Sequence, residues 1–548
     1  MRQSSKIRST LIFMIFLSLY LVLVINLYFI QVWQTNFFSA LGNRQYHIEL
    51  TNYPIRGEIL DRYGRPVALN RENISAFVLP KQLEDAKKLN RFLKKYFPSS
   101  YERLKKSGDK HFIYIARRFP QDLCDQVQCD QITDLKFMQE PSRYYPSEAM
   151  GPVVGITNID NHGMFGLEQV YDATLAGKPT KMFLEKDARH AHYYFKRDLQ
   201  ASGSVGHNLS LTIDSDLQAI AYEALAKSVD KLEAELGCVV IMDAQNGEIL
   251  SLVSYPGFDP NSTQVIDQAK TRLVPVVDSY EYGSIMKVFV ALAALDEGVV
   301  QPDELIDCEN RAETYIDGMK FTTTKSSVNG EIPFSEVVAR SNNIGMVKVA
   351  KRLNEKLYDH YVKLGFGSKT GLNFLGEQSG YVSHPAKWSK RSIISLSFGY
   401  EISATLLQVA RAFALIANGG ELVTPKLILE DKKAKVNSNK KIYDSKVVHI
   451  VQDILRDTVQ HGTGVRAKIR GYDVMGKTGT ANLAMDGTYS QNNLIFTFAG
   501  IVQKGNYNRV IVTCIKNVKN SYKMYGANTA APLFEKIAEQ MLVHDKVV

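Results

Sequence analysis

The stretch GSIMKVFVALAALDEG, residues 283–298, contains a serine, a lysine three residues later and a long apolar run. The apolar residues recur at helical spacing and alanines fill much of the remaining surface, so the pattern predicts a helix buried on all sides. Ser284 is expected at the start of this helix, where free N–H groups and the dipole favour negative charge. Lys287 is then expected one turn inside, close to the serine hydroxyl.

Burial would give Lys287 a chemical role. A lysine in water has a pKa near ~10.4 and is charged at neutral pH. Lowering that pKa to about 7 requires ~4.6 kcal/mol of disfavour for the charged form, which desolvation and a second nearby cation can supply. A neutral Lys287 could then take the proton of Ser284 and make its oxygen a nucleophile.

Two later motifs complete a candidate acyl-transfer site. Residues 341–343 (SNN) supply a second serine and an amide, and residues 477–480 (KTGT) supply the second cation beside small residues that let a ligand approach the backbone. Each motif is weak alone, since Ser-x-x-Lys recurs elsewhere and Lys-Thr-Gly recurs at residues 369–371. The rival serine–lysine pairs lie in polar stretches and the rival Lys-Thr-Gly lies in a glycine-rich loop, whereas two strand-like runs follow Lys477.

In this order, the three motifs resemble those of the penicillin-binding protein and serine β-lactamase superfamily. Their spacing fits a transpeptidase domain better than a small β-lactamase. The resemblance implies that Ser284 is the acylated nucleophile and Lys287 its base. It also implies that Ser341 relays protons, and that Asn343 holds Lys287 and the peptide of the substrate.

The same resemblance assigns residues 477–480 to substrate binding. Lys477 and Thr478 would grip a carboxylate, and Gly479 would leave room for the substrate. The backbone N–H groups of Ser284 and Thr480 would form the oxyanion hole. Tyr282 stands where the family usually has proline and Ile285 where a small residue is common, so the pocket around the serine could have a different shape.

Other segments narrow the resemblance to one branch. Residues 56–64 (RGEILDRYG) look like the signature that follows the membrane anchor of class B penicillin-binding proteins. Residues 155–177 are similar to the pedestal of the division-type (septal) branch, and residues 398–400 (FGY) and 462–464 (GTG) favour the same branch.

Length and composition indicate an ordinary folded protein of two or more domains. The chain has 548 residues, 45% of them apolar and 22% charged, with a net charge of +9. The basic residues are dispersed, so we expect no nucleic-acid partner. His190 and His192 lie in a polar stretch without other ligands, and we expect neither a metal ion nor a cofactor. Cys124 and Cys129 could pair in an oxidising compartment, but their surroundings do not decide it.

The amino terminus predicts a membrane anchor. Leu11–Ile30 is an apolar run about 30 Å long as a helix, which matches one bilayer core. Arg2, Lys6 and Arg8 precede it, so the positive-inside rule places the amino terminus in the cytoplasm. A cleaved signal peptide is the alternative, but the run is long and no clear cleavage site follows. Everything after about residue 34 is therefore expected outside the cytoplasmic membrane, on the periplasmic or extracytoplasmic side.

Four segments are predicted: a cytoplasmic tail (1–8), a transmembrane helix (9–33), a mixed pedestal or dimerisation-type domain (34–205) and a transpeptidase domain (206–548). In the last, strand pairs at both ends flank mostly helical stretches. This order predicts a mixed α/β (α+β) fold with an antiparallel sheet covered by helices on both faces. The stretches expected to be helical include 337–353, 406–416 and 532–543.

The leading hypothesis is a membrane-anchored peptidoglycan D,D-transpeptidase of septal wall synthesis. Ser284 would attack D-Ala-D-Ala of a donor stem peptide, and an amine of a neighbouring stem would resolve the acyl-enzyme. The expected partners are stem peptides, β-lactams as covalent inhibitors, membrane lipid, a polytopic glycan polymerase and other division proteins. The alternatives are an elongation-type transpeptidase, a D,D-carboxypeptidase or β-lactamase, and a non-catalytic penicillin sensor or scaffold.

Overall fold

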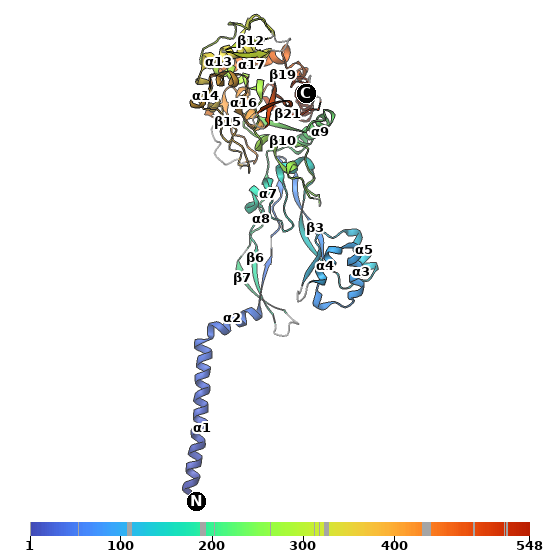
Figure 1. Ribbon diagram of the computed structural model, residues 1–548. Coiled ribbons are helices and arrows are strands. Elements are labelled where there is room, and N and C mark those ends of the chain that lie inside the picture. Colours follow the sequence, from blue (N-terminus) through green and yellow to red (C-terminus); the bar gives the residue numbers. More distant parts are fainter. Residues whose placement is uncertain are drawn as a thin grey trace. The chain divides into compact units, whose positions relative to one another are not determined.

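The computed structural model describes most of the chain: residues 2–52, 54–106, 112–186, 193–201, 203–262, 265–311, 313–316, 318–322, 328–429, 440–485, 488–519, 521 and 524–547. The chain folds into two compact units. One comprises Met1–Arg56 and Ala176–Gly206, and the other comprises Gly57–Leu175 and His207–Val548 (Figure 1). His190 and His192 lie outside the described residues.

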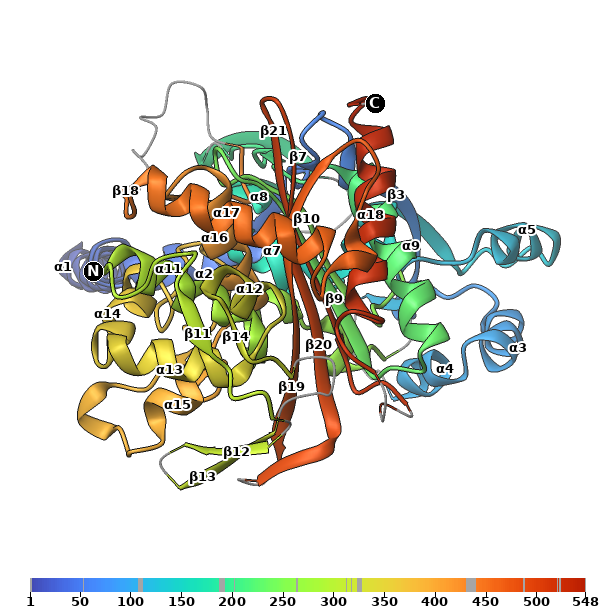
Figure 2. The ribbon, with the colours of Figure 1, turned by 90° about the horizontal axis from the view of Figure 1, so that it is seen from above.

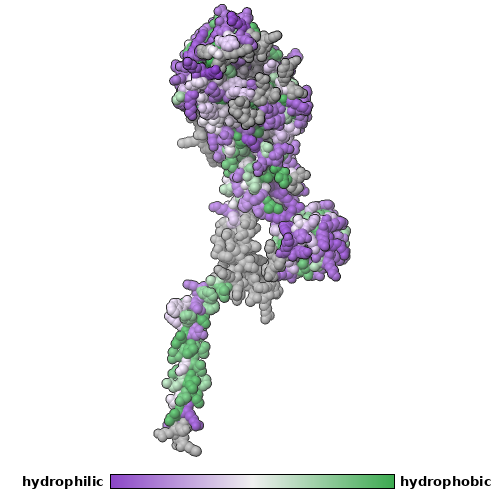
Figure 3. Space-filling view, in the orientation of Figure 1, coloured by the Kyte–Doolittle hydropathy of each residue, from purple (hydrophilic) through white to green (hydrophobic). Residues whose placement is uncertain are grey.

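The first unit contains one long apolar helix. Over Lys6–Trp33 the mean hydropathy reaches 2.5 and no part is buried, so it is the one helix among the described residues long and apolar enough to cross a membrane (Figure 3). A π-helical turn ends this helix, and a three-stranded antiparallel sheet in the order β1–β6–β7 completes the unit. The elements are α1 (Arg2–Tyr28), η1 (Phe29–Trp33), α2 (Thr35–Tyr46), β1 (His47–Asn52), β6 (Thr180–Lys186) and β7 (Tyr193–Ala201).

The second unit begins with a small sheet and a helical lobe. The long strand β3 pairs with β2, β4 and β5, and helices α3, α4 and α5 pack on a separate apolar core (Figure 1). Cys124 and Cys129 both lie on α5, the first buried and the second exposed, and both are free thiols. The elements are β2 (Ile59–Leu60), β3 (Pro66–Val78), α3 (Ala86–Tyr96), α4 (Pro98–Lys105), β4 (Ile113–Ala116), α5 (Gln121–Cys129), β5 (Lys136–Tyr144), α6 (Gly151–Val154), α7 (Gly166–Val170), α8 (Asp172–Ala176) and β8 (Leu209–Ser210).

A five-stranded antiparallel sheet forms the centre of the same unit. Its order is β10–β9–β21–β20–β19, so the first strands in sequence pair with the last. Alternate residues of β9 enter two separate cores: Val240 belongs to one and Val239 to the other. The strands are β9 (Leu236–Asp243), β10 (Ile249–Tyr255), β19 (Asp473–Met485), β20 (Thr488–Lys504) and β21 (Tyr507–Lys516).

Helices cover both faces of this sheet (Figure 2). Helices α9 (Ser215–Lys231) and α18 (Ala530–His544) pack on one face, and α16 (Leu406–Ala417), α11 (Lys287–Asp296) and α17 (Ser445–Gln460) pack on the other. The predicted fold class is therefore confirmed. The remaining helices are α10 (Val274–Val277), α12 (Phe334–Ala339), α13 (Asn343–Leu353), α14 (Lys356–Lys363) and α15 (Ser392–Ser397).

The second unit also contains pairs of short antiparallel strands outside the central sheet. They are β11 (Leu305–Asp307) with β14 (Glu331–Pro333), β12 (Glu313–Ile316) with β13 (Met319–Thr322), β15 (Tyr381–Val382) with β16 (Ile402–Ser403), and β17 (Glu421–Leu422) with β18 (Lys440–Lys441).

The prediction of one helical stretch over residues 337–353 is wrong. The structure has two helices, α12 and α13, and the break falls at residues 340–342. Ser341 has φ +58°, in the left-handed region. A residue with a Cβ rarely adopts this conformation, and the helix ends where it does. The Asn342 side chain then caps α13 by accepting from the Gly345 N–H.

Candidate active site

Ser284 lies in a single 3₁₀ turn, η5 (Gly283–Ile285), that leads directly into α11. All residues of α11 from Lys287 to Leu295 are buried, as the apolar sequence pattern predicts. The helix ends at Asp296, just before Gly298 at φ +65°. Ser284 therefore lies just before the start of a helix that is buried from Lys287 to Leu295.

The turn that carries Ser284 packs against the KTGT segment of β19. A methyl group at Gly479 would lie 2.6 Å from the Tyr282 carbonyl oxygen, and one at Gly283 would lie 2.6 Å from the Thr480 carbonyl oxygen. Any side chain at either glycine would push the two segments apart. The two glycines thus bring residues almost two hundred positions apart into contact, the convergence that the sequence hypothesis requires.

Strand β19 is the edge of the sheet, and the Ser284 turn lies beside its free edge. The Thr480 carbonyl faces Gly283, and in an antiparallel strand the N–H of a residue points the same way as its C=O. The Asn482 N–H, two residues further on, also points outward and donates to the Tyr400 hydroxyl at 3.3 Å. The Thr480 N–H is therefore directed at the space next to Ser284.

Lys287 is fully buried and joins the SNN motif. Its Nζ lies 2.7 Å from the Ser341 carbonyl oxygen and 3.2 Å from the Ser341 hydroxyl, and it also contacts Asn343 Oδ1. The left-handed backbone of Ser341 turns both its carbonyl and its hydroxyl towards this amine, at a strain cost of about 1–3 kcal/mol. The structure thus brings Lys287, Ser341 and Asn343 together.

Lys477 is the second fully buried lysine of the site. Burial lowers its pKa to about 7, and its Nζ has a hydrogen bond to the Thr478 carbonyl at 3.2 Å. The pKa of Lys287 also lies well below its ordinary value, first because of burial and second because of the charge on Lys477. The charge on Lys477 therefore disfavours the charged form of Lys287, as the sequence predicts.

Thr463 is a site residue to which sequence reasoning assigns no role. Its hydroxyl lies 3.0 Å from the Thr478 hydroxyl. Its own N–H donates to the carbonyl of Ala339, the last residue of α12, so it links β19 to the segment that carries Ser341. The GTG motif marks this position in the sequence, but only the fold shows what it contacts.

Two distant segments of the chain meet at Glu281. Glu281 precedes the nucleophile by three residues, and its Oε1 accepts hydrogen bonds from the Glu401 N–H at 2.9 Å and the Tyr489 hydroxyl at 3.2 Å. The rings of Tyr400 and Tyr489 meet at 83° with centroids 5.0 Å apart. FGY in the sequence marks Tyr400, whereas no local pattern marks Glu281 or Tyr489.

The rival Lys-Thr-Gly copy is not part of this site. Residues 369–371 form a loop in which Gly371 has φ +90°. The Thr370 N–H and hydroxyl both bind Glu377, so this threonine is occupied in holding the loop. The hydroxyl of Thr370 is therefore engaged within its own loop, whereas that of Thr478 contacts Thr463.

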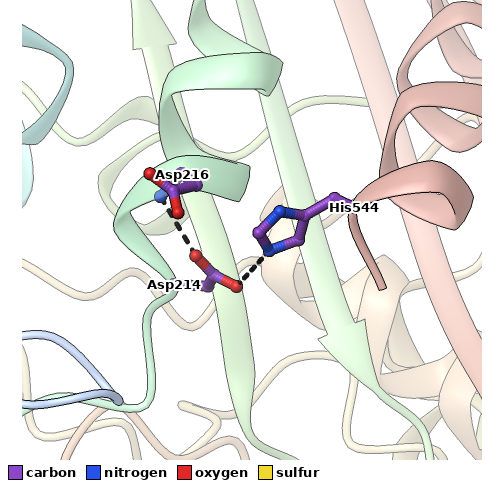
Figure 4. Close-up of side chains that lie close together, drawn as sticks. All are labelled: Asp214, Asp216 and His544. Atoms are coloured by element: carbon purple, nitrogen blue, oxygen red, sulfur yellow. Dashed lines mark hydrogen bonds and ion pairs between the residues drawn. The ribbon is translucent and has the colours of Figure 1, made fainter. Parts of the chain in front are cut away.

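A separate cluster brings together Asp214, Asp216 and His544 (Figure 4). These are residue types that bind metal ions, but Arg65 already pairs with both carboxylates, at 3.3 and 2.5 Å. His544 Nε2 lies 2.7 Å from Asp214 Oδ2. The cluster ties the turn between β2 and β3 to the start of α9 and the end of α18.

Comparisons with known proteins match both parts of the chain. The penicillin binding protein transpeptidase domain family matches residues 237–539, and the penicillin-binding protein dimerisation domain family matches residues 51–211. The peptidoglycan D,D-transpeptidase FtsI of Escherichia coli (strain K12) is 30% identical over 496 residues, covering 88% of this chain and 82% of the relative.

Stage V sporulation protein D of Bacillus subtilis is 29% identical over 557 residues, covering 98% of this chain and 86% of the relative. The crystal structure of penicillin binding protein 3 from Mycobacterium tuberculosis, complexed with aztreonam, superimposes with a TM-score of 0.70 at 25% identity, covering 91% of this chain and 98% of that one. The chain therefore belongs to the penicillin-binding proteins, in the class B branch that joins a dimerisation-type domain to a transpeptidase domain.

Proposed function

We propose that this protein is a serine D,D-transpeptidase that cross-links peptidoglycan stem peptides. One observation carries the proposal: a fully buried Lys287, bonded to Ser341 and Asn343, directly follows the turn that holds Ser284. Burying a lysine without a carboxylate partner costs free energy, and a lowered pKa suits a general base. The similarity to FtsI and the membership of the family support the same reaction.

The hydrogen bonds around Lys287 support a proton relay through Ser341. A neutral amine has two N–H donors and one lone pair, so it cannot donate to all three of its neighbours. The Ser341 carbonyl and Asn343 Oδ1 only accept, so the Ser341 hydroxyl must donate to neutral Lys287. As Ser284 Oγ bonds to the carbonyl carbon, its proton would pass to the Ser341 hydroxyl while Ser341 passes its own proton to Lys287. Lys287 would then return a proton through Ser341 to the departing D-alanine amine as the C–N bond breaks.

Lys477 and Thr478 would bind the terminal carboxylate of the donor. A carboxylate beside Lys477 favours its charged form and raises its pKa above about 7. That charge would then favour neutral Lys287, so substrate binding would prepare the base. Gly479 leaves room for the donor backbone, and the N–H groups of Ser284 and Thr480 would hold the oxyanion.

The order of the segments and the apolar amino-terminal helix support a proposed location. We propose that residues 9–33 anchor the chain in the cytoplasmic membrane, with residues 1–8 inside and both the pedestal (34–205) and the transpeptidase domain (206–548) outside. The basic residues before the apolar helix support this orientation. A polytopic glycan polymerase and division proteins are the proposed partners, and the similarity to FtsI supports a septal role.

Labelling with a fluorescent penicillin tests the acylation step. The full chain in detergent should become labelled at one residue, and Ser284→Ala should abolish labelling while the Ser228→Ala control, on the rival serine–lysine pair of α9, should not. An unlabelled wild-type protein that remains folded would contradict the proposal. Mass spectrometry of a donor peptide with and without an acceptor amine then separates cross-linking from simple hydrolysis, the carboxypeptidase outcome.

The septal role has its own test. A fluorescent fusion should gather at the division site, and the active Ser284 should be required for its function there. Sidewall localisation would favour an elongation-type role. Rescue of a depleted strain by Ser284→Ala would favour a scaffold.

A further inference from the structure

Helix α2 presents an exposed apolar face directly after the apolar helix that can cross a membrane. Phe37 is 62% exposed, Phe38 45% and Leu41 44%. On a helix these three side chains fall within an arc of about 100°, and the polar Thr35 and Ser39 fall on the opposite side. Both sides of these two turns are exposed, so the described part of the chain leaves the apolar face largely uncovered.

A π-helical turn sets the direction of α2. The Gln34 N–H bonds to the Phe29 carbonyl oxygen at 3.0 Å, five residues back, and Gln34 itself leaves helical geometry at φ −102° and ψ 10°. A π-helical turn of this kind bends the path of a helix. Figure 1 and Figure 2 both show α2 running aside from the line of α1. Helix α2 therefore does not prolong the membrane-spanning path.

The length of the apolar run indicates the depth at which this turn occurs. If Leu11–Ile30 spans the hydrocarbon core, Trp33 lies about 4.5 Å beyond its outer edge. That distance falls within the headgroup layer, which is about 5–7 Å thick on each side of the core. A straight helix would carry Phe37 about 10 Å beyond the edge, into water. The bend instead keeps Phe37 in the layer where aromatic side chains are favoured.

The composition and extent of the face favour lipid over a protein partner. Trp33, 80% exposed, and the two phenylalanines give this segment the aromatic character of a membrane interface. Hydrophobic surface extends from α1 onto the start of α2 (Figure 3). The face covers only about two turns, far short of the three to four heptads that a coiled coil with a second copy would need.

We propose that α2 lies along the outer surface of the cytoplasmic membrane, with Phe37, Phe38 and Leu41 in the lipid headgroup layer and Thr35 and Ser39 facing water. This inference rests on the proposed membrane anchor and not on the proposed reaction. Because α2 leads directly into β1, its contact with lipid would fix the height at which the first strand of the chain begins above the bilayer.

The depth of single tryptophans tests this position in the full-length protein, reconstituted into vesicles of phosphatidylcholine and phosphatidylglycerol. The chain has two tryptophans, so Trp33→Phe and Trp388→Phe together give a background without any. Phe37→Trp then places a probe on the apolar face, and Ser39→Trp places the matched control on the polar face. Lipids brominated close to the headgroup should quench Phe37→Trp about threefold more than Ser39→Trp, and iodide in the buffer should quench the two in the reverse order.

Each other outcome contradicts the inference. Strong quenching of Phe37→Trp by lipids brominated near the end of the acyl chain would place α2 in the core. Equal quenching of both probes by brominated lipid would mean that neither face is turned to the membrane. Shielding of Phe37→Trp from iodide only at high protein-to-lipid ratio would indicate a second copy.

Two controls keep the result decisive. The indole N–H of Trp388 donates to the Ser383 carbonyl at 2.8 Å, so its replacement could disturb folding. If the denaturation curve shows this, Trp388 is retained, because its contribution is common to both probes and cancels in their difference. Failure of the wild type to float with the vesicles would overturn the anchor and this inference together, while penicillin labelling would still report on the proposed reaction.

Discussion

The second unit buries cations in two different ways, one in its pedestal part and the other in its transpeptidase part. In the pedestal part, Arg143 and Glu168 are both fully buried and form an ion pair at 2.6 Å. In the transpeptidase part, Lys287 and Lys477 are just as deeply buried, and no carboxylate among the described residues pairs with either. The arginine is paired with a carboxylate, whereas burial without such a pair lowers the pKa of both lysines. We propose that the first arrangement stabilises the fold and that the second provides a base.

The largest effect that distinguishes the two arrangements is expected at Lys287. Lys287→Met keeps the length of the side chain and removes the amine, so acylation by a fluorescent penicillin should slow by about 10³-fold or more. The free energy of unfolding should change little, because the lost hydrogen bonds are offset by removing a buried polar group. Stopped-flow labelling and chemical denaturation of the detergent-solubilised protein measure the two quantities. A variant that labels at the wild-type rate would show that Lys287 is not the base.

Arg143→Met should have the opposite profile. It removes the cation that pairs with the buried Glu168 carboxylate, so the protein should lose about 3–5 kcal/mol of stability. The fraction that remains folded should be labelled by penicillin at the wild-type rate, since neither residue contacts the site. Denaturation curves and labelling of the same samples check this. Equal stability of variant and wild type would mean that the pair does not hold the pedestal together.

The burial of Lys287 could be predicted from the sequence, whereas the pairing of Arg143 with Glu168 could not. The apolar run after Ser284 predicts burial of Lys287 because helical spacing fixes which residues share the core. Arg143 and Glu168 meet through tertiary packing, and nothing local in either segment indicates it. The break at Ser341 is hidden for a similar reason: residues 337–353 keep a helical apolar pattern, while the carbonyl of Ser341 is held by a lysine 54 residues away.

The substrate-binding side shows the same limit. KTGT identifies Lys477 and Thr478 because the motif is contiguous, whereas Thr463, Glu281 and Tyr489 enter the site from turns and strands that only the fold brings together. A sequence pattern reveals groups that lie on one element. Contacts between side chains of different elements depend on loop paths that carry no periodic signal.

Because Lys477 is buried and pairs with no carboxylate among the described residues, the free energy of unfolding should depend on pH. Its pKa is about 7 in the folded protein and ~10.4 in the unfolded chain, so between these values the unfolded chain binds more protons. Stability then rises with pH across this window, by about 2 kcal/mol between pH 7.5 and 9 for this one group. Lys477→Met should lack this contribution, and Arg143→Met should retain it. Denaturation curves at both pH values give the difference, and parallel behaviour of wild type and Lys477→Met would show that Lys477 is not desolvated.

The smallest effect is expected at Thr463. Its hydroxyl contacts the hydroxyl of Thr478, which is proposed to bind the substrate carboxylate together with Lys477. In the structure the Thr478 hydroxyl donates to the Thr463 hydroxyl at 3.0 Å. When Thr478 instead donates its proton to a substrate carboxylate, its oxygen becomes the acceptor for the Thr463 hydroxyl. Thr463→Val keeps the shape but removes that donor, so acylation by a carboxylate-bearing penicillin should slow by about tenfold, while Thr463→Ser should stay close to wild type. The loss should appear mainly as weaker binding before acylation, seen when the labelling rate is measured against penicillin concentration. A loss confined to the maximal rate would mean instead that Thr463 acts through its link to Ala339 and the Ser341 turn.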